Sequence, residues 1–504
     1  MTWPALLLAD PSPCLRWMVL RELFQYSEDH PEVREHYQRR FQFVLVDEYQ
    51  DTNGLQSELI DTLAARHHNI MVVGDDAQSI YAWRGANFQN ILQFPERYPE
   101  TKVYRIETNY RSTPEILTVA NSAISANIHQ FAKQLSAVRK AGEKPVLAIC
   151  HDAGEQAAFV AQRVLELREE GTSLQRMAVL YRSHFHALEL QLELTRRNIP
   201  FSITSGIRFF EQAHIKDAAA YLKLASNPRD ELAFKRLVQL LPGIGGKGAD
   251  KLWKLFYRQV QQNQTTPIAG PAVEAAAAAS EVEPSVVSPA RTFIRPTLQA
   301  CAASVPRKAA VAWAQFVATM AQLEGVDARG NPSRMLRLVL EAGYEDYLEE
   351  TYANYRNRLE DLQQLGVFAQ QYPNVEEFLT QLALLSNVEA EDETPAGKDD
   401  EQLKLSTIHQ AKGLEFDVVF VIMLCDGLFP SGRSLDFPDA LEEERRLLYV
   451  ALTRARNELY LSYPLIRAGF GGAGDSLQRP SRFLQEIPKE QVEEWSLKPF
   501  HPYD

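Results

Sequence analysis

Residues 43–53 have the sequence FVLVDEYQDTN, in which an apolar run of strand type ends in two acidic residues, Asp47 and Glu48. In a parallel sheet, ligands bind beyond the carboxyl ends of the strands. Two carboxylates at such an end are placed to hold Mg²⁺ and to orient or deprotonate a water molecule. An acidic turn after a strand is also common without any function, so this stretch alone leaves both interpretations open.

Around this stretch, short β-branched runs alternate with longer segments of helical spacing. Runs at residues 70–73 and 103–106 predict further strands, and residues 55–65 predict a helix. This alternation is typical of parallel strands joined by crossover helices. A second set of predicted strands lies at residues 145–150, 177–181, 201–204, 403–408, 418–424 and 459–463. The sequence therefore predicts an α/β protein with two parallel-sheet units.

The second unit is interrupted by a mostly helical segment at residues 215–400, with helical spacing at residues 218–225, 232–241, 309–324, 332–341 and 375–385. Within this insertion, residues 265–306 are rich in Ala, Pro, Ser and Val, which predicts a poorly ordered loop of low complexity. The acidic stretch at residues 389–401 predicts an exposed linker that returns to the second sheet.

Charge and cysteine content narrow the class of protein. The 504 residues include 53 Lys and Arg against 66 Asp and Glu, a net charge of −13, which disfavours a protein that coats nucleic acid with its whole surface. A local basic channel remains compatible with this balance. The four cysteines form no C-x-x-C pair, so we expect a reducing cytoplasm and neither disulfides nor a zinc site. The longest apolar run, residues 418–424, is too short to cross a bilayer, and no membrane partner is expected.

A second segment with candidate chemistry is VVGDDAQSIYAWRGA at residues 72–86. It again follows a strand, so the amide of Gln78 is placed to sense a phosphate or a water molecule. Tyr81, Trp83 and Arg84 together suit stacking on unpaired bases with a phosphate contact. A buried aromatic cluster with a surface arginine is the alternative interpretation.

The third segment, ETNYRS at residues 107–112, also follows a predicted strand. Arg111 at a strand end can reach the γ-phosphate of a nucleotide, and Tyr110 can stack on a base. The following Ser112 and Pro114 also resemble a capped helix start, and the two interpretations are compatible.

Two more segments lie far along the chain. Residues 405–421, LSTIHQAKGLEFDVVFV, place a polar turn with His409, Lys412 and Glu415 between two apolar strands. Residues 442–456, EEERRLLYVALTRAR, combine helical apolar spacing with several arginines. An amphipathic helix with a charged solvent face is the usual meaning of the latter pattern.

Taken together and in this order, the five segments resemble motifs II to VI of the UvrD/Rep/PcrA group of superfamily 1A DNA helicases, and the resemblance runs from about residue 41 to 463. It implies two RecA-like domains of the P-loop NTPase type with ATP between them, single-stranded DNA across the top, and 3′ to 5′ translocation. It assigns residues 1–40 to a remnant of a helical 1B-like subdomain, 41–108 to a partial first RecA-like domain (1A), 109–214 and 401–485 to the second (2A), 215–400 to a 2B-like insertion, and 486–504 to a C-terminal tail.

The resemblance also implies roles in ATP hydrolysis. Asp47 would hold Mg²⁺, and Glu48 would be the general base for the attacking water. Gln78 would contact the γ-phosphate and couple it to DNA. Arg111 and Arg454 would stabilise charge on the transferring phosphoryl group, which is the main task of the protein in this chemistry.

Ligand contacts are implied in the same way. Tyr110 would stack on the adenine and Glu415 would contact the ribose, which makes the implied ATP-binding set Tyr110, Arg111, Glu415 and Arg454. The implied DNA-contact and coupling set is Tyr81, Trp83, Arg84 and His409.

The sequence departs from this family in one respect. Family members begin with a strand–GxxxxGK[ST]–helix unit, whose backbone N–H groups and lysine cradle the phosphates. This sequence has no Gly-Lys-Ser or Gly-Lys-Thr, and its glycine-rich stretch at residues 243–248 has no Ser or Thr after Lys247 and lies between predicted helices. The first RecA-like domain is therefore expected to be incomplete as written.

Three functional hypotheses follow. The first is an ATP-dependent 3′–5′ DNA helicase acting on single-stranded and junction DNA in repair or replication restart, with an upstream chain that carries the P-loop and repair proteins as candidate partners. The second is a catalytically dead, truncated remnant that binds DNA or a repair partner. The third, the helicase subunit of a recombination helicase–nuclease, is disfavoured because no acidic nuclease constellation follows Tyr463.

Overall fold

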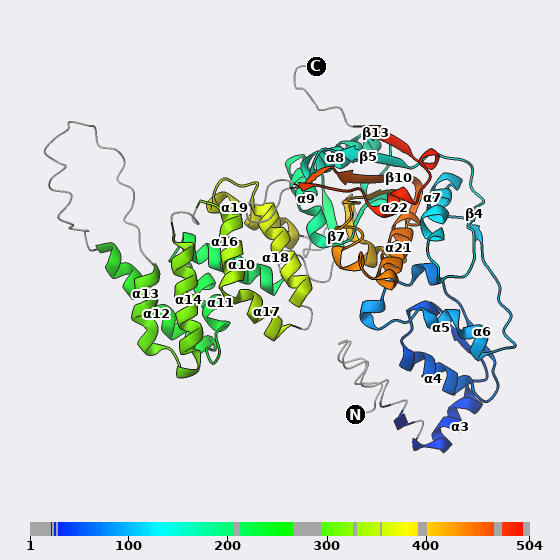
Figure 1. Ribbon diagram of the computed structural model, residues 1–504, viewed down its shortest axis with the longest axis horizontal. Coiled ribbons are helices and arrows are strands. Elements are labelled where there is room, and N and C mark those ends of the chain that lie inside the picture. Colours follow the sequence, from blue (N-terminus) through cyan, green and yellow to red (C-terminus); the bar gives the residue numbers. More distant parts are fainter. Residues whose placement is uncertain are drawn as a thin grey trace, which may run out of the picture. The chain divides into compact units, whose positions relative to one another are not determined.

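The computed structural model describes residues 22, 25–26, 29–204, 212–265, 294–325, 330–352, 355–391, 401–467 and 476–496 (Figure 1). The chain forms two compact units. The first comprises residues 1–204, 401–465 and 478–504, and the second comprises residues 205–400 and 466–477. The predicted helical insertion lies in the second unit, which also takes in residues 466–477.

The first unit contains a seven-stranded sheet with the strand order β13-β5-β10-β9-β6-β8-β7. All neighbouring strands are parallel. Every residue of the central strands β6 and β9 is buried, as expected for parallel strands that are covered on both faces. The predicted α/β fold class is therefore confirmed. The strands are β5 (Val146–Cys150), β6 (Met177–Tyr181), β7 (Phe201–Thr204), β8 (Leu403–Thr407), β9 (Phe416–Val421), β10 (Ala455–Pro464) and β13 (Glu493–Ser496).

Helices cover both faces of this sheet (Figure 1). Helix α8 (Ala153–Glu169) packs on α9 (Leu188–Arg196), while α7 (Pro114–Ser125) packs on α21 (Pro438–Leu452). The connections from β5 through α8 to β6, and from β6 through α9 to β7, both run toward the β7 edge of the sheet. The connection from β9 through α21 to β10 runs toward the opposite edge. Because such connections are right-handed, α21 lies on the opposite face from α8 and α9.

One strand of the sheet was not predicted. The C-terminal tail assigned to residues 486–504 contains β13, which pairs with β5 at the edge of the sheet. The polar sequence EEWS has little strand character, but Trp495 packs against the rings of Phe159 and Tyr460, with centroids 6.4 and 6.0 Å apart. The segment assigned to a C-terminal tail thus contributes the four residues of β13 (Glu493–Ser496) to the large sheet.

A separate two-stranded parallel sheet, β1 (Val44–Val46) and β2 (Ile70–Val72), carries the FVLVDEYQDTN stretch. Helix α4 (Gly54–Ala64) begins with a capping box, in which Asn53 and Gln56 each accept a hydrogen bond from the other's backbone N–H. One face of the strand pair contributes to a small core around the buried residues Tyr49, Ile91 and Phe94.

The third strand predicted for this region, at residues 103–106, does not form. The segment is extended and its apolar side chains are exposed. Its composition favours a strand, but a strand also needs a hydrogen-bonded neighbour, and the two-stranded sheet of the described residues supplies none at this position. The predicted helical piece at residues 1–40 lies partly outside the described residues, and its described part contains α3 (Pro31–Arg40).

The second unit is helical, as predicted. Its main helices are α10 (Ala213–Ser226), α11 (Glu231–Gln239), α12 (Gly246–Thr265), α13 (Ile294–Cys301), α14 (Ala310–Leu323), α16 (Pro332–Val339), α17 (Glu345–Thr351), α18 (Tyr355–Ala369) and α19 (Val375–Glu391). The glycine-rich stretch at residues 243–248 runs from the loop after α11 into the first turn of α12. No helix in the described ranges combines the length and the apolar character needed to cross a membrane.

The prediction of a low-complexity loop at residues 265–306 is wrong for residues 294–301, which form α13. Ile294, Leu298 and Cys301 are buried and recur at the spacing of one helix face, a signal that the average composition of the window conceals. Residues 266–293 of the predicted loop lie outside the described residues, as do residues 392–400 of the predicted acidic linker.

The packing of α11 gives a test of the second unit. Phe234 is fully buried, and its ring stacks on Phe256 at a centroid distance of 4.7 Å, whereas Leu232 on the same helix is exposed. We expect Phe234→Ala to reduce the free energy of unfolding by about 3–5 kcal/mol, because it leaves a cavity, and Leu232→Ala to change it by less than about 0.5 kcal/mol. Urea denaturation followed by circular dichroism measures both, and equal effects would contradict this packing.

Candidate functional site

The acidic pair lies where β1 ends, and both side chains are exposed. Glu48 has a φ of 51°, a left-handed conformation that is uncommon for a residue other than glycine and that often occurs at functional sites. The N–H of Glu48 donates to Asp47 Oδ1 at 2.9 Å, and Gln50 Nε2 donates to Glu48 Oε2 at 2.6 Å. These bonds hold the two carboxylates in fixed positions beside one another.

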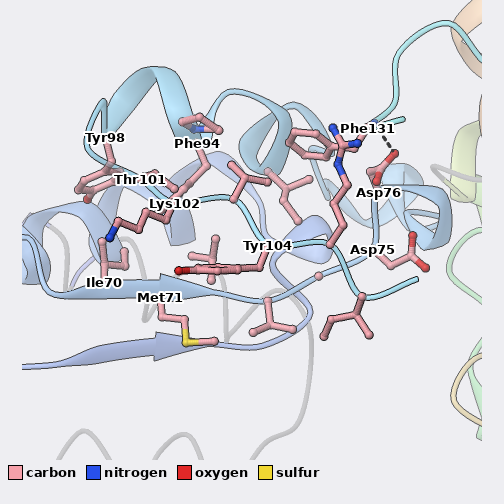
Figure 2. A pocket seen from close by; sticks show the side chains of 18 of the residues that line it. Ile70, Met71, Asp75, Asp76, Phe94, Tyr98, Thr101, Lys102, Tyr104 and Phe131 are labelled. Carbon is pink, nitrogen blue, oxygen red and sulfur yellow. Dashed lines mark hydrogen bonds between the residues drawn. The ribbon is translucent and has the colours of Figure 1, made fainter. Parts of the chain in front are cut away.

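Beside this pair lies a hollow of about 830 Å³, between the β2 region and residues 98–106 (Figure 2). Its volume is in the range of small-molecule sites. Of the predicted site residues, Asp47, Glu48 and Gln78 line it, whereas the other predicted ATP contacts are not among its lining residues.

Gln78 lies at the end of the short helix η2 (Asp76–Gln78) and joins two distant parts of the first unit. Its Nε2 donates to Asp75 Oδ2 at 2.8 Å, which leaves its Oε1 to accept from Arg454 Nη2 at 3.4 Å. Lys133 forms ion pairs with both Asp75 and Asp76. It thereby holds the carboxylate of Asp75, which orients the side-chain amide of Gln78. The structure therefore brings Gln78 and Arg454 together.

Lys133 was missed by the sequence reasoning. It lies in FAKQLSAV, outside every segment singled out above, and no strand or helix pattern marks it. Asp76 is buried, and burial raises the pKa of its carboxyl group while Lys133 opposes that rise. A lysine placed against two neighbouring carboxylates becomes recognisable only in three dimensions.

Arg454 lies between α21 and β10 and is almost fully buried. Its Nε donates to the carbonyl oxygen of Val450 and its Nη1 to that of Leu414, both at 3.1 Å. Burial, together with the nearby charge of Arg111, lowers the pKa of Arg454 to about 10, so the side chain stays charged at neutral pH.

Arg111 and Glu415 also meet. The carboxylate of Glu415 accepts from Arg111 Nε through one oxygen and from Arg456 Nη2 through the other. Burial raises the pKa of Glu415, but the hydrogen bonds from Arg456 and Arg111 outweigh this effect, and the net pKa is lowered. Tyr110, next to Arg111, is exposed and therefore accessible to a ligand.

Lys412, noted in the sequence but given no role, connects the turn after β8 to the acidic stretch. Its Nζ lies 2.5 Å from Asp51 Oδ2 and 3.7 Å from Glu48 Oε2, and it donates to the carbonyl oxygen of Gln78 at 2.9 Å. Lys412 belongs to the segment at residues 405–421, and its side chain contacts the segments at residues 43–53 and 72–86. One cation thus links three of the predicted segments.

The predicted DNA-contact residues form one cluster. Tyr81 donates from its hydroxyl group to the carbonyl oxygen of His409 at 2.8 Å, and the rings of Trp83 and His409 meet edge to face. The guanidinium of Arg84 lies over Trp83, 4.6 Å from the ring centroid. Trp83 remains 64% exposed, so it is not a core residue and its face is accessible to a stacking partner.

Helix α21 does not present a charged solvent face. Arg445 and Arg446 are buried. Arg445 forms two hydrogen bonds to Glu486, at 2.8 and 2.7 Å, and Arg446 pairs with Glu442 at 3.2 Å. The interpretation of this segment as an ordinary solvent-exposed helix face is therefore wrong for these two arginines.

A Mg²⁺ site is compatible with the acidic pair. Among the described residues, no group of three or more His, Cys, Asp or Glu side chains is arranged to hold a metal ion. Mg²⁺ bound with a nucleotide, however, commonly takes only one or two carboxylates and fills its remaining positions with phosphate oxygens and water. The exposed carboxylate of Asp47 beside Glu48 fits that donor set.

Comparison with known families identifies the chain. The model for the UvrD-like helicase C-terminal domain matches residues 104–465. The chain belongs to the UvrD-like helicase family. The model for the UvrD/REP helicase N-terminal domain matches residues 18–99. The α/β fold, with its large parallel sheet and many helices, is consistent with the RecA-type domains of UvrD-like helicases.

Known UvrD-like relatives cover most of this chain. It is 35% identical over 486 residues to DNA helicase II of Haemophilus influenzae, covering 95% of this chain and 63% of the relative. The same protein of Escherichia coli is 34% identical, with 93% and 62% covered, and the ATP-dependent DNA helicase PcrA of Bacillus subtilis is 34% identical, with 93% and 60% covered. The chain thus spans less than two thirds of the length of these relatives.

The half-buried His409 gives a pH test of the site. Burial, with the charges of Arg182 and Arg84, lowers the pKa of His409 from 6.5 to about 3. Between these values the unfolded chain binds a proton that the folded chain does not, so stability falls as the pH falls through this window. The free energy of unfolding, measured by urea denaturation at pH 7.5 and 4.5, should therefore fall more for the wild type than for His409→Gln, by on the order of 1 kcal/mol per pH unit below 6.5. Identical differences would show that His409 stays as basic as in the unfolded chain.

Proposed function

We propose that this chain forms most of an ATP-dependent DNA helicase that moves 3′ to 5′ along single-stranded DNA, acts on single-stranded and junction DNA in the cytoplasm, and serves repair or replication restart. The contact that carries the proposal is the one between Gln78 and Arg454. It joins a residue after β2 to a residue before β10, so that a γ-phosphate bound near Gln78 is coupled to the large sheet. Relatives named as DNA helicases support the substrate class.

In this proposal hydrolysis depends on charge placement. Asp47 would hold Mg²⁺, which supplies positive charge at the β- and γ-phosphates. Glu48 accepts a proton from the attacking water, and its exposed carboxylate is accessible for that role. Arg111 and Arg454 neutralise the charge that develops on the transferring phosphoryl group.

Nucleotide binding requires a rearrangement of Arg111. In the structure its guanidinium is neutralised by Glu415, which also binds Arg456. We propose that the phosphates of ATP take Arg111 from Glu415, and that Glu415 then contacts the ribose while Tyr110 stacks on the adenine. Arg456 stays with Glu415 and keeps its charge compensated during the exchange.

In the proposed DNA site, Trp83 stacks on a base, while Tyr81, Arg84 and His409 contact the strand and couple it to the ATP site. The bond from Tyr81 to the backbone of His409 and the ion pair from Lys412 to Asp51 link this cluster to the acidic stretch. Loss or gain of a phosphate beside Gln78 then alters the surface on which the bases lie.

A second function, DNA binding without hydrolysis, is supported by one observation. The sequence contains no Gly-Lys-Ser or Gly-Lys-Thr, and therefore no phosphate-cradling loop of the family's kind. A DNA-binding chain needs the Trp83 cluster but not the acidic pair.

ATP hydrolysis distinguishes the two functions. We expect the full chain, supplied with a segment that carries the family's strand–GxxxxGK[ST]–helix unit, to hydrolyse ATP at a rate that single-stranded DNA stimulates. Glu48→Gln should lower that rate by about 10²–10⁴-fold, because it removes the general base. A coupled phosphate-release assay measures the rates of both proteins, with and without the added segment. Equal, background-level rates in all samples would overturn the helicase proposal and leave DNA binding without hydrolysis.

DNA binding is tested separately. Trp83→Ala should weaken the affinity for a fluorescently labelled oligo(dT) by about 5- to 100-fold, since stacking contributes about 1–3 kcal/mol per base. Phe43→Ala removes another exposed aromatic side chain of the first unit and serves as the matched control. Fluorescence anisotropy at a fixed salt concentration measures the affinities. Unchanged binding by Trp83→Ala would remove Trp83 from the DNA site.

A further inference from the structure

The turn that carries the exposed Trp83 is a short element. Helix η3 (Ala82–Arg84) has three residues, and Gly85, with a φ of 88°, ends it. The side chain of the preceding Tyr81 does not cap this helix, because its hydroxyl group donates to His409 instead. A single turn of this kind has little stability of its own. The position of Trp83 therefore depends on contacts from outside the turn.

One such contact comes from helix α21. The N–H of Ala82 donates to Glu443 Oε1 at 3.0 Å. The first N–H groups of a helix have no acceptor within that helix, so Glu443 supplies from another element the cap that η3 lacks. Glu443 is partly buried, and burial raises the pKa of its carboxyl group while the hydrogen bond from Ala82 opposes that rise.

The part of α21 that carries Glu443 is itself firmly held. Nε and Nη2 of Arg182 both lie 2.8 Å from Glu444 Oε1. The buried guanidinium of Arg446 lies over the ring of Phe88, 4.1 Å from its centroid. Because these contacts lie on both sides of Glu443 in the sequence, its carboxylate is a fixed acceptor to which the turn can be anchored.

We propose that Glu443 is a positioning residue of the DNA site, whose carboxylate holds the turn at residues 81–85 so that Trp83 presents its face to a base of single-stranded DNA. This inference rests on the proposed function, in which a base stacks on Trp83. Glu443 does not contact the DNA and acts through the backbone of Ala82. A side chain that keeps an oxygen acceptor at position 443 therefore keeps most of the effect.

The position of Glu443 on α21 has a consequence for coupling. The chain leaves the other end of this helix at Arg454, which donates to the side chain of Gln78. Residues 444–452, which lie between Glu443 and the end of the helix, are all buried. One packed helix thus holds the Trp83 turn near its start and the amide of Gln78 just beyond its end.

The first test measures DNA affinity without nucleotide, by fluorescence anisotropy of a labelled oligo(dT) at a fixed salt concentration. Glu443→Ala should weaken binding by about 3- to 10-fold, as is typical for one lost hydrogen bond. Glu443→Gln, whose amide oxygen still accepts from Ala82, should bind within about twofold of the wild type. Asp439→Ala removes an exposed carboxylate one turn earlier on the same helix and should leave the affinity unchanged.

Two further measurements separate positioning from a general loss of structure. The double variant Glu443→Ala/Trp83→Ala should bind no more weakly than Trp83→Ala, because the residue that Glu443 positions is then absent. Hydrogen exchange followed by mass spectrometry should show faster exchange of residues 79–87 in Glu443→Ala than in Asp439→Ala, with no DNA present.

The outcomes distinguish this inference from the proposed function. Weaker binding by Trp83→Ala with unchanged binding by Glu443→Ala would overturn the role of Glu443 and leave the DNA site in place. Additive losses in the double variant, unchanged exchange of residues 79–87, or an equal loss in Asp439→Ala would also overturn it. Unchanged binding by Trp83→Ala would reject the DNA site of the proposed function, and the role of Glu443 with it.

Discussion

The burial of one charged side chain, Arg454, determines much of the arrangement around the candidate ATP site. A guanidinium taken out of water must find acceptors, and Arg454 finds them in the carbonyl groups of Leu414 and Val450 and the amide oxygen of Gln78. These acceptors come from the turn before β9, from α21 and from the end of η2. Moving any one of these elements away would leave a buried charge partly unpaired, so the three segments are energetically coupled through this residue.

The same reasoning applies to the other charged side chains of the candidate site. Lys412 faces Asp51, Lys133 faces Asp75, and Glu415 lies between two arginines. Charged side chains that are partly buried need compensating partners within the protein, and here each of them has one. In the proposed function, binding of ATP would exchange these ion pairs for new ones, and that exchange would connect a change at the phosphate to distant parts of the sheet.

The sequence predicted the large sheet well and the geometry of the site only in part. Central parallel strands are continuous apolar runs, which is why the predicted bounds of β6 coincide with the observed strand. The contact between Gln78 and Arg454 joins residues 376 positions apart, and no local pattern contains that information. The family resemblance grouped these two residues, but it did not indicate Lys133, whose role depends on a carboxylate 58 positions away.

Two of the errors in strand prediction have one physical cause. Residues 103–106 are apolar and form no strand, whereas the polar residues of β13 form one because β5 offers a free edge and Phe159 and Tyr460 accept the ring of Trp495. Strand formation thus depends on an available edge at least as much as on local composition. By the same argument, residues 103–106 and the exposed, paired residues Leu45 and Met71 of β1 and β2 have the apolar composition of a sheet interior without its neighbours.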